Sequence, residues 1–388
     1  MDERRIVIFS TAYAPFIGGA EIAVKEITDR LSDCTFDLFT ARLDKHLPAK
    51  EKMGNVMVYR LGIGVPFIDK LWLAFFGHRT ALRHHQEKKY DVVWSIMASY
   101  AGLAGLFFKK RCNEIQFLLT LQEGDSQKHI YSRALFIWPW FKKIFEQADQ
   151  IQAISHYLAD WAKRMGGICP ITVVPNGVDL SIFSRRSDIE RKQQTEWLRK
   201  ILAVPDETRF IISVSRLEKK NGLDDLVNAL CDLPKNIRLL ILGDGSERAH
   251  LKHSVQQLSL ERRIHFLGSI PYQELPQYLA GSEIFCRPSL SEGLGNAFLE
   301  AMAVGTPVIG TRVGGIPDFL FDEQTGLFCE PHNPVSIATA VKRLLSDNEL
   351  RAMVTESAYN LVHERYSWDR VTEDIKKVLF FYHVSTKV

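Results

Sequence analysis

The feature of this sequence that most constrains its fold is an alternation of short apolar segments with helical patterns, which runs through the chain twice. Residues 5–10 form the first apolar segment, and a helix is expected from about Ala20, with Val24, Ile27 and Leu31 on one face. This alternation is typical of parallel sheets covered by helices, so the sequence predicts an α/β fold. Strands are expected at residues 5–10, 36–40, 56–60, 92–96, 117–121, 151–154 and 171–174, and again at 210–214, 239–242, 264–267, 284–286, 308–310 and 326–328.

The alternation is interrupted between its two runs. Pro175-Asn176-Gly177 precedes a strongly polar stretch at residues 184–200, after which the pattern begins again. We therefore expect two Rossmann-like domains, residues 1–185 and 186–366, and a C-terminal amphipathic helix within 367–388 that packs back toward the first domain. Ligands of open α/β sheets bind beyond the carboxyl ends of the strands, so the expected site is a cleft between two facing domains.

The most informative segment is PSLSEGLGNAFLEAM at residues 288–302, which follows a predicted strand and opens a helix. Backbone N–H groups at a helix N-terminus suit a diphosphate. Glu292 is expected in the loop and Glu300 about one turn into the helix, and carboxylates accept hydrogen bonds from sugar hydroxyls well. Taken alone, the segment also fits an ordinary turn with two solvated glutamates.

Cations and glycines follow other predicted strands. Arg216 and Lys220 come after residues 210–214, where they can neutralise a departing diphosphate, although a lone basic turn is more often solvated surface. Gly243 ends the next strand and permits close backbone approach. Gly18 and Gly19 open the first helix, but they do not form G-x-G-x-x-G, so a dinucleotide fingerprint is not supported.

Together these segments resemble family 4 of the retaining glycosyltransferases, whose fold of two facing Rossmann-like domains is called GT-B. The resemblance covers nearly the whole chain. It implies transfer of a sugar, of the hexosyl type, from a UDP- or GDP-linked donor to an acceptor hydroxyl in polysaccharide, glycolipid or cell-envelope glycan synthesis. It rests on GGAE at 18–21, PNGVD at 175–179, SRL and KNG within 215–222, SEGLGNAFLEAM at 291–302, GTPVIGTRVGGIPD at 305–318 and YSW at 366–368.

The resemblance also implies roles for residues. Glu292 is expected to contact the transferred sugar, Glu300 the ribose hydroxyls, and Arg216 and Lys220 the diphosphate. No metal and no cofactor beyond the nucleotide sugar is expected, and the leaving phosphate is expected to take the acceptor proton in a front-face attack. The backbone groups expected to line the donor are those of Gly18, Gly19, Gly243, Gly293, Leu294, Gly295 and Asn296.

One position departs from the family pattern. Where the family often has a histidine near the reacting sugar, this chain has Gln122, which can hydrogen-bond but cannot titrate. Glu123 and Asp125 are candidates for holding the acceptor or taking its proton, although 123–125 also fits a simple polar turn. Glu21 is a further candidate for holding the acceptor. Two other functions stay open: a catalytically weak nucleotide-sugar-binding subunit, and a nucleotide-sugar epimerase on the same architecture.

Charge and apolar patterning bear on partners. The net charge of +3 is too small to indicate nucleic acid as a partner. Residues 70–143 hold 12 Lys and Arg against 5 Asp and Glu, interleaved with aromatic segments at 71–76, 106–111 and 135–140. This pattern fits a patch that attaches to an anionic membrane, or core aromatics beside solvated lysines. The apolar runs are too short for a spanning helix and the N-terminus lacks a signal-peptide pattern, so we expect a cytoplasmic protein. The first of these two alternatives would place it peripherally on the inner membrane face.

The cysteines give no sign of a metal or redox site. They are far apart and include no C-x-x-C pair, which argues against zinc. We expect buried, reduced thiols at Cys34, Cys112, Cys169, Cys231, Cys286 and Cys329.

Overall fold

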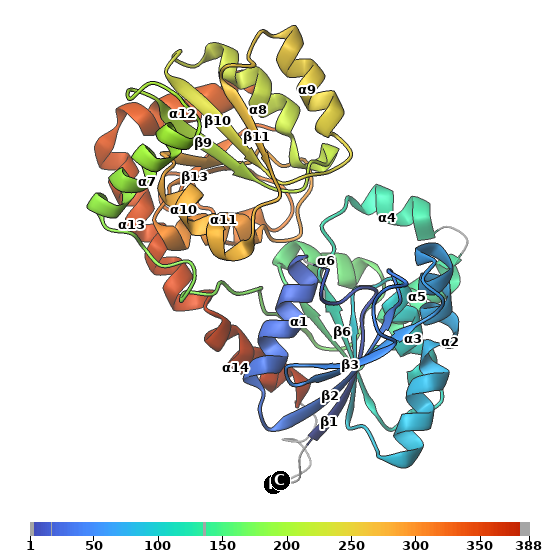
Figure 1. The fold of residues 1–388 in the computed structure, drawn as a ribbon. Helices are drawn as coiled ribbons and strands as arrows, with labels where there is room; N and C mark the ends of the chain where they lie inside the picture. The colour runs from blue at the N-terminus through green and yellow to red at the C-terminus, as the bar shows by residue number, and fades with distance from the viewer. Residues whose placement is uncertain (1–3, 17, 135–136, 381–388) are drawn as a thin grey trace. The chain divides into compact units, whose positions relative to one another are not determined.

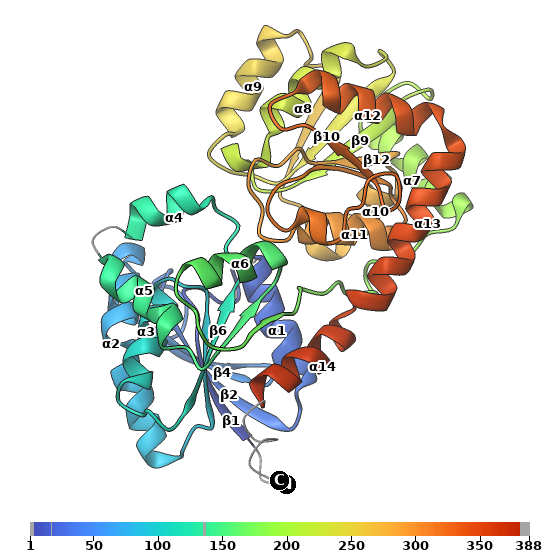
Figure 2. The same ribbon diagram turned by 180° about the vertical axis from the view of Figure 1, so that it is seen from behind.

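The structure, a computed structural model, describes residues 4–16, 18–134 and 137–380. Its contacts divide the chain into two compact units: unit 1 comprises Met1–Gly177 and Trp368–Val388, and unit 2 comprises Val178–Ser367. Each unit contains one sheet of largely parallel strands with helices on its faces (Figures 1 and 2). The predicted α/β class with two Rossmann-like domains is therefore confirmed.

Unit 1 is built on an eight-stranded sheet in the order β3-β4-β2-β1-β5-β6-β7-β8. Neighbouring strands are parallel except β3 and β4, which are antiparallel. The order reverses between β1 and β5, so the loops after these two strands lie at the place where open α/β sheets bind ligands. The strands are β1 (Arg4–Phe9), β2 (Cys34–Ala41), β3 (Lys50–Met53), β4 (Val56–Leu61), β5 (Val92–Ile96), β6 (Gln116–Leu121), β7 (Gln150–Ala153) and β8 (Ile171–Val173).

Helices cover both faces of this sheet (Figure 1). On one face α1 packs against α14, and their apolar side chains form a core with Ile6, Ile8 and Trp94 of the sheet. On the other face α3 packs against both α2 and α5. The helices of unit 1 are α1 (Gly19–Arg30), α2 (Pro66–Glu87), α3 (Tyr100–Lys109), α4 (Gln127–Ala134), α5 (Trp138–Glu146), α6 (His156–Arg164) and α14 (Trp368–Leu379).

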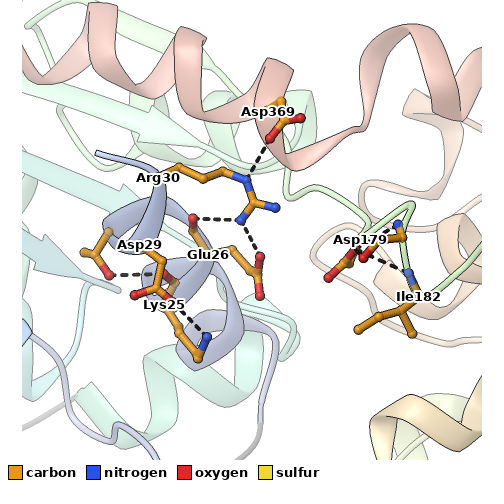
Figure 3. Close-up of polar contacts among 9 residues, drawn as sticks. Lys25, Glu26, Asp29, Arg30, Asp179, Ile182 and Asp369 are labelled. Atoms are coloured by element: carbon orange, nitrogen blue, oxygen red, sulfur yellow. Dashed lines mark hydrogen bonds and ion pairs between the residues drawn. The ribbon is translucent and has the colours of Figure 1, made fainter. Parts of the chain in front are cut away.

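Polar contacts hold α14 on α1. Arg30 donates from Nη1 to Glu26 on its own helix and from Nε to Asp369 of α14 at 2.9 Å (Figure 3). Lys376 pairs with Asp33 at 2.6 Å. With Trp368 buried beneath these pairs, the C-terminal helix is an integral part of unit 1.

Unit 2 is built on a six-stranded parallel sheet in the order β11-β10-β9-β12-β13-β14. The order reverses between β9 and β12. Its strands are β9 (Arg209–Val214), β10 (Ile237–Leu242), β11 (Ile264–Gly268), β12 (Ile284–Cys286), β13 (Val308–Thr311) and β14 (Leu327–Cys329). Its α-helices are α7 (Asp188–Ile201), α8 (Leu223–Ala229), α9 (Arg248–Gln257), α10 (Leu275–Ala280), α11 (Asn296–Val304), α12 (Pro334–Ser346) and α13 (Asn348–Arg365).

The division between the units lies between Gly177 and Val178, eight residues before the predicted boundary of 185/186. Val178 donates its backbone N–H to the carbonyl oxygen of Tyr366 at 2.7 Å, and it also forms a bridge with Ser367. The start of the second run is thus tied to the end of α13. Because this hydrogen bond joins segments far apart in sequence, the local composition around Val178 could not predict the boundary.

The predicted strands are all present, and one further strand, β3, was missed. Lys50–Met53 is polar and largely exposed, because it pairs only along one side as the antiparallel edge of the sheet. The six thiols are free, as predicted, but two of them are not buried: Cys169 is half-buried and Cys231 is exposed. The spacing of cysteines along the chain does not predict which of them lie at the surface.

The three aromatic segments proposed for a membrane patch have different environments. In the first, Leu73 and Ala74 are core, whereas Leu71, Trp72 and Phe76 are exposed. In the second, Leu106 and Phe108 are fully buried. In the third, Trp140 is exposed, and Leu135 and Phe136 lie outside the described residues. Among the helices described, none combines the length and apolar character that crossing a bilayer requires.

Candidate active site

The loops after β9 and β12 meet at the point where the strand order of unit 2 reverses. The carbonyl oxygen of Lys220, in the loop after β9, accepts backbone N–H groups from Leu290 at 2.6 Å and Ser291 at 3.3 Å, in the loop after β12. Open α/β sheets bind ligands at this position. The two segments that the sequence singled out separately are therefore one backbone-bonded structure.

Glycines make this close approach possible. Gly222 has φ +66°, and a Cβ atom on it would lie 2.0 Å from the carbonyl oxygen of Pro288. Gly243, at the end of β10, has φ +124°, and a Cβ atom there would lie 1.9 Å from the carbonyl oxygen of Ser215. Any larger residue at either position would push the loops apart. Gly243 thus supports the loop that carries Arg216.

Both predicted cations lie on the loop after β9. Arg216 is exposed and Lys220, in the short 3₁₀ helix Lys219–Asn221, is half-buried. Asn221 fixes the loop from within, because its buried side chain donates from Nδ2 to the carbonyl oxygen of Arg216 at 2.6 Å. Hydrogen bonds to the loop backbone therefore fix the positions from which the Arg216 and Lys220 side chains extend.

Glu292 lies in the loop after β12 and is held by Arg287. Nη2 of Arg287 donates to Oε2 of Glu292 at 2.5 Å, and the backbone N–H of Gly293 donates to Oε1 at 3.1 Å. The two side chains are only 7% and 17% exposed. Arg287 also lies over the ring of Phe298, 4.8 Å from its centroid. Burial of both groups makes this ion pair a fixed element of the site rather than a solvated surface contact.

Glu300 lies one turn inside α11 and is buried. Burial raises the pKa of its carboxyl to about 7, against the opposing influence of a hydrogen bond from the Tyr272 side chain and the charge of Arg287. A carboxyl group whose pKa lies near neutrality in a ligand site is a frequent feature of functional sites. Arg287 thus acts on both glutamates of the 292–300 segment.

The N-terminus of α11 has no side-chain cap. Gly295 occupies the N-cap position with φ +110° and offers no side-chain acceptor to the first turn of the helix; the N–H of Phe298 donates to the carbonyl oxygen of Gly295 at 2.9 Å. Gly293 and Leu294, which precede it, are buried, and Asn296 is the first helical residue. This arrangement suits an anion beside the loop.

In unit 1 the predicted residues at the first helix lie together. Gly18 is the N-cap of α1, Gly19 its first residue, and Glu21 lies in its first turn. The Glu21 carboxylate covers this end of the helix, since its Oε2 would be 2.3 Å from a Cβ atom on Gly18. A carboxylate there is stabilised by the positive end of the helix dipole.

The first two residues after β6, Gln122 and Glu123, are buried rather than part of an exposed polar turn. Gln122 accepts a hydrogen bond at Oε1 from Nδ2 of Asn176 at 3.2 Å. Glu123 accepts at Oε1 from the backbone N–H of Ala98 at 2.6 Å, which joins the loops after β5 and β6. Burial raises the pKa of Glu123 to about 7, and the charge of Asp125 acts in the same direction. Asp125 itself is half-buried.

Two residues of the unit 2 site were missed by sequence reasoning: Arg287 and Tyr272. A charged residue directly after the fully buried strand β12 was a signal for Arg287, because such a residue needs a buried partner. Tyr272 lies in the short 3₁₀ helix Tyr272–Glu274, remote in sequence from Glu300, and the sequence carries no signal for their contact.

Two groups of metal-ligating side chains occur among the described residues, and neither includes a predicted site residue. They are His85 with Cys112 and Glu114, and Asp224 with Glu247 and His250. In the first group, Nδ1 of His85 accepts the backbone N–H of Tyr90 at 3.0 Å, so the neutral ring carries its proton on Nε2 and that nitrogen is not free to bind a metal. In the second, the exposed His250 pairs with Asp224 at 2.9 Å.

Comparison with known proteins agrees with this architecture. Residues 17–182 match the family described as Glycosyltransferase Family 4, and residues 194–361 match Glycosyl transferases group 1. A glycosyltransferase of Methanocaldococcus jannaschii is 32% identical over 396 residues, covering 96% of this chain and 97% of that protein. A D-inositol 3-phosphate glycosyltransferase of Corynebacterium glutamicum is 33% identical over 232 residues, covering 57% of this chain and 52% of that protein.

Solved structures share the fold at low sequence identity. Sucrose-phosphate synthase from Thermosynechococcus elongatus superposes with a TM-score of 0.85 at 22% identity, covering 98% of this chain and 100% of that one. Anabaena HepE in complex with UDP-glucose gives a TM-score of 0.78 at 19% identity, covering 97% of this chain and 99% of that one. The resemblance inferred from sequence motifs is thereby confirmed: this chain belongs to glycosyltransferase family 4, the group 1 glycosyltransferases, and has their GT-B fold.

Proposed function

We propose that this glycosyltransferase transfers a sugar from a UDP- or GDP-linked donor to an acceptor hydroxyl with retention of anomeric configuration. The observation that carries the proposal is the meeting of the loops after β9 and β12, which brings two cations and two buried or half-buried glutamates to the strand ends of unit 2. HepE, which shares this fold, is described in complex with UDP-glucose, and this supports a nucleotide-sugar donor.

In this proposal unit 2 binds the donor. Glu300 accepts hydrogen bonds from the ribose hydroxyls, and the uncapped N-terminus of α11 receives the diphosphate. Arg216 and Lys220 add positive charge on the diphosphate. Glu292, oriented by Arg287, contacts the transferred sugar. Gly18 and Gly19 are assigned to the donor on the family resemblance.

Unit 1 binds the acceptor in this proposal, through Gln122, Glu21 and Asp125. Glu123 is a second candidate, but its contact with the N–H of Ala98 and its deep burial favour a role in holding the loop that carries Gln122. We assign the acceptor to polysaccharide, glycolipid or cell-envelope glycan synthesis.

The reaction exchanges one C–O bond for another at the anomeric carbon. The acceptor oxygen attacks from the face that the diphosphate leaves, the bond from the anomeric carbon to the phosphate oxygen breaks, and that oxygen takes the acceptor proton. Fixed positive groups at the developing phosphate charge are the main electrostatic contribution available here. The cations Arg216 and Lys220 make this contribution without a divalent ion, so turnover is expected to survive treatment with a chelator. Loss of turnover that added Mg²⁺ or Mn²⁺ restores would contradict metal independence.

The decisive experiment is a panel of nucleotide sugars screened for thermal stabilisation, since a ligand of the native state raises its apparent stability. Transfer from the stabilising donor to a panel of glycan and lipid acceptors is then followed by NMR, which reports the anomeric configuration of the product. An α-linked donor should give an α-linked product. Stabilisation without transfer would indicate a binding subunit, and a changed sugar without an acceptor would indicate an epimerase.

We also propose a cytoplasmic location. Six free cysteines fit a reducing compartment, where thiols persist. Fractionation of cells that express the tagged chain tests this, and recovery in an oxidising compartment would overturn it.

A further inference from the structure

Helix α2 has apolar side chains on two opposite faces. One face, with Leu73, Gly77 and Ala81 spaced four residues apart, is buried against unit 1. The other face is exposed, although it is also apolar; Phe67 is 68% and Trp72 50% exposed. We call this face the α2 surface, made of Phe67, Ile68, Leu71, Trp72 and Phe76. A helix that is apolar on both sides needs an apolar partner on each.

The segment that leads into α2 extends this exposed apolar area. Ile63 is 70% exposed, and Val65 is also exposed. The buried carboxylate of Asp69 accepts three backbone N–H groups, from Ile63 at 3.0 Å, Gly64 at 2.7 Å and Val65 at 3.0 Å. Asp69 therefore fixes the turn while its charge is turned inward, and this end of the surface presents no carboxylate from α2.

Cations border the α2 surface. Arg79 lies over the ring of Phe76, 5.0 Å from its centroid, and Lys110 at the end of α3 lies 5.9 Å from the ring centroid of Phe107. Within the described ranges, no ion pair joins a carboxylate to any of five neighbouring cations, which are Lys70, Arg79, Arg83, Lys110 and Arg111. Their charge is thus available to an outside anion.

We propose that the α2 surface inserts into the headgroup region of an anionic lipid bilayer, with these cations on the lipid phosphates, so that the enzyme acts on a lipid-linked acceptor. This inference rests on the proposed function and names its acceptor class. Interfacial helices are anchored in this way, by aromatic and aliphatic side chains at the boundary between headgroups and acyl chains and by neighbouring cations.

The charge distribution favours lipid over the other occupants of such a surface. A second copy of the chain would bring its own cations against these, and like charges across an interface oppose association. An anionic bilayer offers both a hydrocarbon region for the apolar side chains and negatively charged headgroups for the cations. The helix lies along the interface in this arrangement rather than crossing the membrane.

The test is co-sedimentation of the full chain with phosphatidylcholine vesicles, with and without phosphatidylglycerol, at low and high salt. The wild type should bind the anionic vesicles at low salt and lose binding at high salt. Phe67→Ser/Trp72→Ser should weaken binding by about a hundredfold, because each of the two aromatics contributes roughly a factor of ten on burial. Lys70→Gln/Arg79→Gln/Arg83→Gln should remove the preference for phosphatidylglycerol.

The matched control is Ile189→Ser/Val335→Ser, which removes two apolar side chains of unit 2 that are at least as exposed as Trp72. It should bind vesicles like the wild type. Brominated lipid should quench tryptophan fluorescence in the wild type and less in Trp72→Phe, which keeps an aromatic anchor. Circular dichroism melting confirms that each variant is folded.

Other results would overturn the proposal. Equal vesicle binding by the wild type and Phe67→Ser/Trp72→Ser would show that the α2 surface is not the anchor, and absence of binding would exclude lipid. A wild-type dimer that becomes monomeric in this variant would assign the surface to self-association. Donor stabilisation and transfer to a water-soluble acceptor should be unchanged in every α2 variant, so failure of the lipid proposal is separable from failure of the proposed function.

Discussion

The guanidinium of Arg287 donates to the carboxylate of Glu292 at 2.5 Å, within the loop that joins β12 to α11. Both side chains are mostly buried, and the same guanidinium influences the carboxyl of Glu300, eight residues after Glu292. Since a buried charge without a partner is costly, each member of the pair depends on the other. The pair therefore links the stability of this loop to the position of the glutamate proposed to contact the sugar.

Removal of Arg287 should destabilise the protein more than removal of the pair. Arg287→Gln leaves the Glu292 carboxylate without its cation and should cost about 2–3 kcal/mol of unfolding free energy. Arg287→Gln/Glu292→Gln, which neutralises both groups, should recover part of this loss. Urea unfolding of both single variants and the double variant measures the coupling, and strictly additive effects would show that the pair carries no interaction energy.

Arg216→Ala should lower turnover while leaving the fold intact, because the side chain is exposed and its loop is held by backbone and Asn221 contacts. Loss of one preorganised stabilising group typically costs on the order of 10²–10³-fold in turnover. The control is Lys219→Ala, which removes an adjacent exposed cation outside the proposed site. Wild-type turnover in a folded Arg216→Ala protein would refute the assigned role.

Donor binding should strengthen as pH rises through about 7, the pKa to which burial raises Glu300. Ribose hydroxyls donate to a carboxylate, so binding favours the ionised form and should tighten by up to about tenfold per pH unit below that value. Calorimetric titration with the nucleotide sugar, whose diphosphate diester does not titrate in this range, measures this dependence. Glu300→Gln should bind more weakly and with a flat pH profile; a wild-type slope retained in that variant would assign the titration elsewhere.

The ligand-free protein provides the complementary readout for Glu300. Its folded-state pKa of about 7 lies above the ordinary value of 4.5, so the folded state holds the proton more tightly than the unfolded state. The resulting contribution to stability is fully present below 4.5 and is lost as pH rises to about 7. Between pH 5 and pH 8 the free energy of unfolding of the wild type should therefore fall by about 3 kcal/mol at most through this group. Glu300→Gln lacks the titrating carboxyl and should not show this part of the loss.

Gln122→Ala should impair transfer more than Gln122→His. The Gln122 oxygen is engaged by Asn176, which leaves its amide N–H groups to position a sugar hydroxyl, and a neutral histidine can also donate there. Turnover of the wild type and both variants with the identified donor and acceptor measures this difference. If the wild type is inert with a stabilising donor while Gln122→His gains activity, the chain is a nucleotide-sugar binder that has lost its chemistry.

The sequence alone determined the class of fold and the family. Strand positions such as Arg209–Val214 and Ile284–Cys286 are visible because buried parallel strands need continuous apolar runs, which are a local property. The residues of the loops after β9 and β12 were likewise visible, because glycines, cations and glutamates follow those runs directly. The edge strand β3 was not visible, since one unpaired, exposed side removes the need for apolar residues.

Only the tertiary structure decided which of these residues act together. The Arg287–Glu292 pair depends on side-chain direction within a loop, and the contact of Tyr272 with Glu300 joins segments that no local pattern relates. The burial of Glu123 and the exposure of Phe67 and Trp72 depend on which neighbours cover each position. A local sequence pattern specifies whether a segment forms a strand, a helix or a loop. The burial of a side chain, its pairing and its pKa are set by the atoms that the tertiary structure places around it.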